Sequence, residues 1–129
     1  MDKQELQRRT KQFALRVFKL VDALPRTVVG RAVANQLVRS ATSVGANYRA
    51  ACRARSRAGF AAKLGTVLEE ADESLYWLEL IREGKLIAES KLSLLLKEAA
   101  ELTAILAAGR KSAAANTSNI KHRRSNIPS

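Results

Sequence analysis

Apolar residues recur at spacings of three and four along most of this 129-residue chain, and proline occurs only at positions 25 and 128. Such spacing gathers apolar side chains on one face of an α-helix, whereas half-buried strands require strict alternation. Four helices are expected, over residues 2–24, 27–53, 56–83 and 89–108. Short connections between comparable helices predict an all-α fold, an antiparallel up-down four-helix bundle.

Capping residues and helix breakers set the expected helix ends. Pro25 ends the first helix, Thr27 and Ser56 are the expected N-caps of the second and third, and Gly84 and Gly109 end the third and fourth. The sequence therefore predicts a bundle over residues 1–109. Residues 110–129 lack periodicity and predict a basic, disordered tail. Gly45, inside the second helix, predicts a bend or a close contact between helices.

The periodic apolar positions form the expected core. They are Leu6, Phe13, Val17, Leu20 and Leu24 in the first helix; Val29, Val33, Leu37, Ala41, Val44 and Tyr48 in the second; Phe60, Leu64, Val67, Leu68, Ala71, Leu75 and Leu78 in the third; and Leu92, Leu95, Ala99, Leu102 and Leu106 in the fourth.

Charge is segregated along the chain. Residues 1–63 carry fourteen Lys and Arg against three Asp and Glu, residues 64–109 carry four against nine, and residues 110–129 carry five against none. A cationic surface attracts polyanions because binding releases their condensed counterions. RNA or DNA is therefore the first partner to test.

One stripe of arginines lies opposite the apolar face of the second helix, and no Asp or Glu occurs between Arg26 and Lys63. Guanidinium groups offer forked donors that match phosphate oxygens in pairs. The alternative is the solvated polar face that any amphipathic helix has. The predicted phosphate contacts are Arg31, Arg39, Arg49, Arg53, Arg55, Arg57 and Lys63.

The third helix carries more apolar surface than a single buried face needs. Its additional apolar residues are Tyr76, Trp77, Leu80 and Ile81, and they predict a subunit interface. The alternative is a central helix wrapped by its neighbours. Four acidic residues on this helix could face the basic second helix, within a subunit or across an interface. They are Glu69, Glu70, Asp72 and Glu73.

Residue types with catalytic chemistry are few. The only histidine, His122, lies in the tail, the single cysteine, Cys52, has no histidine base within the bundle, and no glycine-rich phosphate loop is present. The sequence thus predicts a protein that is not an enzyme and has no cofactor and no metal. A polar first segment, one cysteine and no apolar run of bilayer length predict a cytoplasmic protein without membrane contact.

The stretch Leu37–Ile81, LVRSATSVGANYRAACRARSRAGFAAKLGTVLEEADESLYWLELI, carries a family resemblance, together with Leu24-Pro25 before the second helix. It resembles bacterial four-helix-bundle proteins encoded in intervening sequences of large-subunit ribosomal RNA genes, which are related to the accessory variability determinant of diversity-generating retroelements. The resemblance covers residues 5–108. Many relatives have proline where Gly45 stands, a Glu-Gly pair where Ala50-Ala51 stand, and glutamate where Gly59 stands. The loss of these two acids makes this chain more cationic than its relatives in this region.

The resemblance implies an antiparallel four-helix bundle that assembles into a homopentamer with basic surface available to nucleic acid. In the retroelement relatives the pentamer acts as a scaffold that binds a reverse transcriptase and its RNA or DNA. We therefore expect a non-catalytic, oligomeric protein that binds RNA or DNA phosphates without sequence-specific readout. The alternative function is that of a protein-interaction scaffold or adaptor, for example for a reverse transcriptase.

Overall fold

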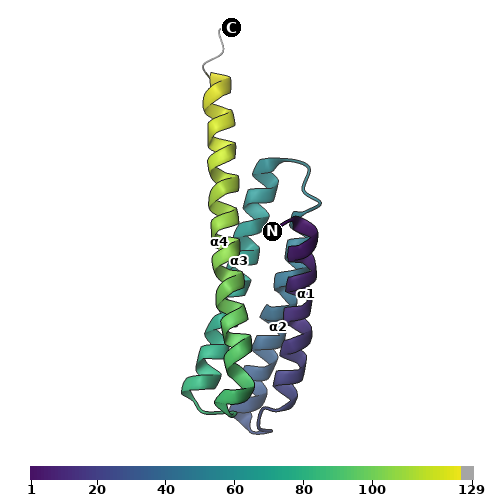
Figure 1. Ribbon diagram of the computed structural model, residues 1–129, viewed down its shortest axis with the longest axis vertical. Coiled ribbons are helices and arrows are strands. Elements are labelled where there is room, and N and C mark those ends of the chain that lie inside the picture. Colours follow the sequence, from purple (N-terminus) through teal and green to yellow (C-terminus); the bar gives the residue numbers. More distant parts are fainter. Residues whose placement is uncertain (126–129) are drawn as a thin grey trace.

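Four helices account for nearly all of the chain. The computed structural model describes the backbone of residues 1–125 and the side chains of residues 1–115. The helices are α1 (Lys3–Asp22), α2 (Val28–Ala51), α3 (Arg57–Glu83) and α4 (Glu89–Ser125), and no strand occurs among the described residues (Figure 1). α1 and α3 each pack against α2 and α4, which encloses one core and confirms the all-α bundle.

Short polar side chains cap three of the helices. Asp2 accepts a hydrogen bond from Glu5 N at 2.7 Å, Thr27 from Gly30 N at 3.1 Å, and Ser56 from Gly59 N at 3.0 Å. The caps expected at Thr27 and Ser56 are therefore confirmed. Each one satisfies a backbone donor that the first turn of the helix leaves without a partner.

The core follows the apolar periodicity closely. All the predicted residues of α1 and α4 are buried, as are most of those in α2 and α3, with Phe60, Leu68 and Leu75 packed at its edge. Val29 is the exception, since 58% of its surface is exposed. In this first turn of α2 the buried residue is instead Gly30, where a Cβ atom would lie only 1.9 Å from Pro25 O in the connection from α1. The close approach of the α1–α2 turn leaves no room there for a side chain.

Two buried hydroxyl groups connect α2 to α3. Ser40 and Ser74 are fully buried, and their Oγ atoms share a hydrogen bond of 2.9 Å. Each also lies within hydrogen-bonding distance of a backbone carbonyl of its own helix, Leu37 O for Ser40 and Glu70 O for Ser74. These bonds offset the cost of burying the hydroxyls, which an apolar core would otherwise leave without partners.

The contact of α1 with α2 depends on small residues. A Cβ atom on Gly45 would lie 3.5 Å from the backbone carbon of Thr10, so the two helices approach closely at this point. The close contact predicted for Gly45 is therefore confirmed. Thr10 is fully buried there and donates its hydroxyl proton to Leu6 O at 2.9 Å.

The contact of α1 with α4 depends on charge. Arg9 donates through Nε to Glu98 at 2.8 Å and through Nη2 to Glu98 at 2.5 Å and to Glu101 at 2.8 Å. The Arg9 and Glu98 side chains are largely buried, with 20% and 14% of their surfaces exposed. The hydrogen bond from Arg9 is the main cause of the lowered pKa of the Glu98 carboxyl.

α4 does not end where the sequence predicted. It continues through Gly109 and extends past the other three helices (Figure 1). A glycine within a helix costs only about 1 kcal/mol relative to alanine, and the next residues include the helix-favouring run Ala113–Ala115. The side chain of Ala113 packs partly against the core. The predicted helix end at Gly109, and with it a tail without regular structure from residue 110, is therefore wrong for the described part of this segment.

Candidate nucleic-acid interface

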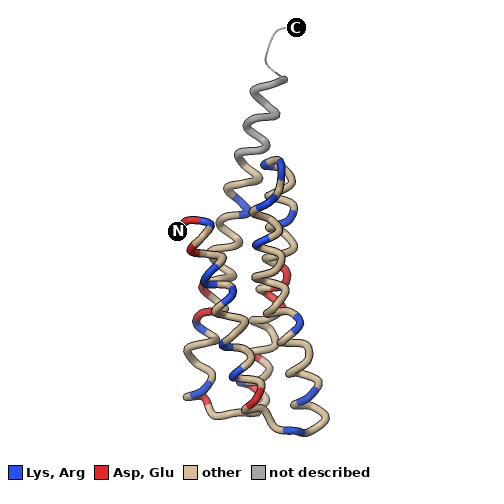
Figure 2. Tube along the Cα trace, turned by 90° about the vertical axis from the view of Figure 1, so that its right-hand side faces the viewer, with Lys and Arg blue, Asp and Glu red and all other residues tan. Residues whose placement is uncertain are grey.

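The cations predicted to contact phosphate all lie at the surface. Arg31, Arg39 and Arg49 come from the outer face of α2, Arg53 and Arg55 from the α2–α3 connection, and Arg57 and Lys63 from the beginning of α3. Each is exposed. Figure 2 shows Lys and Arg gathered at the end of the bundle that the α2–α3 connection forms. This end and the outer face of α2 are continuous, because α2 leads directly into the connection.

Arg39 differs from the other predicted contacts because carboxylates of α3 reach it. Its Nη2 lies 2.5 Å from Glu73 Oε1, and its Nη1 lies 3.8 Å from Glu70 Oε2. The hydrogen bond from Arg39 is the main cause of the lowered pKa of Glu73. The expected contact between the acidic residues of α3 and basic α2 thus occurs within one subunit. Arg39 is partly neutralised, which the acid-free sequence around it did not reveal.

The other predicted cations form no ion pair with the side chains that the structure describes. The ion pairs among residues 1–115 involve Arg8, Arg9, Arg39 and Arg82, and none includes Arg31, Arg49, Arg53, Arg55, Arg57 or Lys63. Arg31 makes only a long hydrogen bond of 3.4 Å from Nε to Thr27 O. Six of the seven predicted residues therefore remain available to an external anion.

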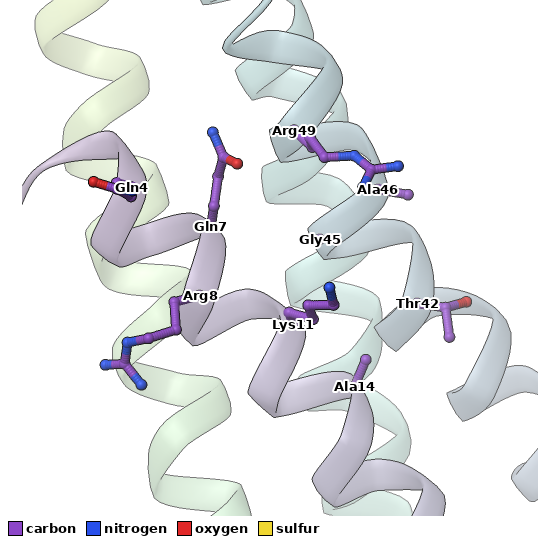
Figure 3. A pocket seen from close by; sticks show the side chains of 9 residues that line it. All are labelled: Gln4, Gln7, Arg8, Lys11, Ala14, Thr42, Gly45, Ala46 and Arg49. Atoms are coloured by element: carbon purple, nitrogen blue, oxygen red, sulfur yellow. The ribbon is translucent and has the colours of Figure 1, made fainter.

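A groove between α1 and α2 borders this cationic surface (Figure 3). Its volume is about 520 Å³, and it is lined by Gln4, Gln7, Arg8, Lys11 and Ala14 of α1 and by Thr42, Gly45, Ala46 and Arg49 of α2. Lys11 reaches towards α2, whereas Arg8 points away from it and pairs with Glu5 (Figure 3). Lys11 is not among the predicted phosphate contacts, because these were all chosen from α2, the α2–α3 connection and the beginning of α3. The position of Lys11 on the polar face of α1 was a usable signal.

Two further basic residues lie near the same end of the bundle. Lys3 Nζ lies 4.4 Å from the centre of the Phe60 ring, an attractive contact between a cation and an aromatic face. The Arg110 guanidinium of α4 covers Gly65 of α3, since a Cβ atom there would lie 3.1 Å from Arg110 Nε. The absence of a side chain at Gly65 thus makes room for Arg110 at this surface. The side chains of Lys121, His122, Arg123 and Arg124 lie outside the described residues.

The predicted subunit interface on α3 is only partly exposed. Ile81 is fully buried in the core, so the expectation that it projects away from the bundle is wrong. Trp77 is half-buried, packs edge-on against Tyr76 with ring centres 5.3 Å apart, and donates its Nε1 proton to Glu73 at 3.3 Å. Leu80 is also half-buried, and Tyr76 is 53% exposed. α3 packs against both α2 and α4, and of the four predicted interface residues only Ile81 is fully buried.

Other apolar side chains are exposed where the sequence analysis did not expect them. On α1 these are Leu15 and Phe18, and on α4 the side chain is Leu94, which is 72% exposed. The apolar spacing of three between Leu15 and Phe18 was the available signal. Both residues lie outside the inward stripe of α1.

The described residues include no group of three or more His, Cys, Asp or Glu side chains that could hold a metal ion. Cys52 is half-buried at the end of α2. Burial and the neighbouring Cys52 raise the pKa of the Tyr48 phenol. Among the described helices, none combines the length and apolar character that crossing a membrane requires.

Comparisons with known proteins agree with this fold. The sequence model of the family described as 23S rRNA-intervening sequence proteins matches residues 2–108. A solved structure of a protein of unknown function from the S23 ribosomal protein family of Bacteroides thetaiotaomicron is similar, with a TM-score of 0.75 and 33% sequence identity over 82% of this chain and 98% of the other. No curated protein matches the chain significantly. The chain, with its four-helix bundle and basic α2, belongs to the 23S rRNA-intervening sequence protein family.

Proposed function

We propose that this protein is an antiparallel four-helix bundle that binds RNA or DNA through backbone phosphates and carries out no catalysis. The observation that carries the proposal is a group of exposed cations on α2, the α2–α3 connection and the beginning of α3 that have no carboxylate partner among residues 1–115. Carboxylates within the molecule would have neutralised these side chains if their role were only to hold the helices together. Unpaired guanidinium groups at the surface favour binding to an external polyanion.

The proposal predicts binding that weakens steeply with salt. Affinity for a structured RNA and for a duplex DNA would be measured by fluorescence anisotropy across a salt series. The logarithm of the association constant should fall linearly with the logarithm of salt concentration, because each phosphate contact releases counterions. Affinity that stays constant across the series would overturn the proposal.

A triple variant locates the contacts. Replacing Arg53, Arg55 and Arg57 with Gln should reduce the salt slope for duplex DNA by about 2 to 3, because each lost contact contributes about 0.9. The matched control replaces Lys85, Lys91 and Lys97 with Gln, three exposed cations near or on α4. Equal losses in both variants would show that net charge, rather than this surface, determines the affinity.

A protein-interaction scaffold is the second candidate function, and the exposed apolar residues Leu15, Phe18, Tyr76 and Leu94 favour it. Such residues also support association into a homo-oligomer, for which we propose a pentamer. Light scattering on the purified chain measures the oligomeric state. In a complex with a candidate partner such as a reverse transcriptase, charge reversal at Arg39 and Arg49 would weaken the protein complex more than RNA binding if the scaffold role is correct.

A further inference from the structure

We propose that the groove between α1 and α2 holds the phosphodiester backbone of a single-stranded nucleic acid. The inference rests on the proposed function and specifies both the surface and the form of the ligand. The groove lies beside the predicted cations of α2 and shares one of them, Arg49. A strand lying in it would therefore continue onto the cationic end of the bundle.

Of the three cations that line the groove, Arg8 pairs with Glu5, and the other two come from different helices. Lys11 comes from α1 and Arg49 from α2, both are exposed, and neither belongs to an ion pair among residues 1–115. None of the nine lining residues is a carboxylate. An ammonium and a guanidinium group on opposite walls can donate to the oxygens of one phosphate or of two successive phosphates.

Small residues leave the groove open between these cations. Ala14 lies on the α1 side, Gly45 and Ala46 lie on the α2 side, and Gly45 also allows the helices to approach at Thr10. Gln4, Gln7 and Thr42 add neutral donors and acceptors. These groups suit the ester oxygens of a nucleic-acid backbone, which accept hydrogen bonds without carrying a full charge. In an RNA strand the 2′-hydroxyls can accept and donate there as well.

The dimensions of the groove favour a single strand. A volume of about 520 Å³ lies within the range of small-ligand sites, so it admits a short stretch of sugar and phosphate. In a duplex each backbone is paired with a second strand, so a single strand enters a groove of this size more readily than a duplex does. No aromatic residue is among the nine that line the groove, so bases gain no stacking surface there. Binding should therefore show little preference for base sequence.

The groove between α1 and α4 provides a matched comparison. It measures about 400 Å³ and also contains three cations, Arg16, Lys19 and Lys91. Its other lining residues are mostly apolar: Leu20, Ala23, Leu94 and Leu95, with Ser90. It offers a phosphate backbone fewer neutral polar partners than the groove between α1 and α2. Removing its charges therefore controls for the general effect of charge.

The first test uses a fluorescein-labelled oligodeoxythymidine as the single-stranded probe. The Lys11→Gln/Arg49→Gln variant should bind about tenfold more weakly at low salt, and its salt slope should fall by about 1.4, because each phosphate contact of a single strand contributes about 0.7. The Arg16→Gln/Lys19→Gln variant, with the same loss of charge, should change affinity less than threefold. Equal effects of the two variants would overturn the inference.

The second test blocks the groove without changing any charge. Ala46 is exposed, so Ala46→Trp should fold normally while its indole fills the groove. This variant should lose single-strand affinity about tenfold and keep its affinity for duplex DNA, which contacts the outer cations. Circular dichroism verifies folding, and light scattering compares oligomeric state. If Ala46→Trp binds the strand like the wild type, or if it changes the oligomeric state, the groove does not hold the strand.

The two proposals fail in different ways. A wild-type protein whose affinity for every nucleic acid is absent or insensitive to salt would refute both. A wild-type protein with salt-dependent binding, combined with groove variants that bind oligodeoxythymidine normally, would refute only the groove.

Discussion

α1 meets α2 and α4 by different means. Towards α4, Arg9 is held by Glu98 and Glu101, so its charge is used within the molecule. Towards α2, the helices approach at Gly45, the turn between them packs against Gly30, and Lys11 and Arg49 meet no carboxylate among residues 1–115. Basic side chains therefore hold the helices together on the α4 side of α1, and they remain available to an external anion on the α2 side. Local charge density in the sequence does not distinguish these two uses, whereas the packing of the helices does.

The largest effect is expected from a substitution at Gly30, where α2 packs against the α1–α2 turn. Gly30→Ala would place a Cβ atom 1.9 Å from Pro25 O, a backbone atom that cannot move without shifting the α1–α2 turn. We expect the free energy of unfolding to fall by about 3 kcal/mol, measured by urea denaturation. A loss below about 1 kcal/mol would show that the turn is more adaptable than its geometry indicates.

The next largest effect is expected from removing Arg9, which holds α1 to α4 through its ion pairs. Arg9→Met would leave the largely buried Glu98 carboxylate without its main partner, and we expect a loss of about 2 kcal/mol in the same measurement. Lys19→Met, on the exposed surface of α1, serves as the control and should change stability little. Nucleic-acid affinity should remain nearly that of the wild type in Arg9→Met. A strong loss of affinity would show that the α4 side of α1 also takes part in nucleic-acid binding, and would contradict the comparison above.

A smaller effect depends on pH. The pKa of Glu98 is lowered in the folded protein, chiefly by the hydrogen bond from Arg9, so its contribution to stability is present above the ordinary carboxyl pKa of 4.5 and is lost as pH falls through the lowered value. Wild type should therefore be more stable than Glu98→Gln at neutral pH. This difference should shrink steadily on acidification in urea titrations at several pH values. A difference that does not depend on pH would rule out the ionised pair as its source.

The smallest effect should be a gain in stability. A Cβ atom on Gly45 would lie no closer than 3.5 Å to Thr10, an ordinary van der Waals distance, and the backbone of Gly45 has no positive φ. Gly45→Ala should therefore raise the free energy of unfolding by about 0.5 to 1 kcal/mol through higher helix propensity. Thermal denaturation measures the change. A loss of stability would mean that the two helices already touch more tightly at Gly45 than at an ordinary contact.

Much of the fold could be predicted from the sequence because it depends on local pattern. The apolar spacing and the caps at Thr27 and Ser56 identify the helices and most of the core without reference to distant residues. The errors arise where distant segments decide the outcome. Ile81 is buried because α3 has neighbours on several sides. Val29 is exposed although the segments involved are close in sequence, since the neighbouring Gly30 is the residue that packs against Pro25.

The candidate site was predictable in part for the same reason. The positions of the arginines on α2 follow from helical geometry, but the pairing of Arg39 with Glu73 joins residues 34 positions apart. Lys11 and Arg49 come together only because α1 and α2 pack side by side. The extension of α4 beyond Gly109 was missed because a single glycine is a weaker helix breaker than its usual place at helix ends suggests.

The hydroxyl pair in the core has a consequence for evolution. Ser40 and Ser74 bond each other as well as carbonyls of their own helices, so replacing one with an apolar residue removes the bond between α2 and α3 and leaves its partner with the carbonyl of its own helix alone. Replacing both with alanine removes the two buried polar groups together. Substitutions at these two positions should therefore arise together in the lineage. The bond between these two residues helps to fix the rotation of α2 relative to α3, and that rotation determines the direction in which the arginines of α2 point.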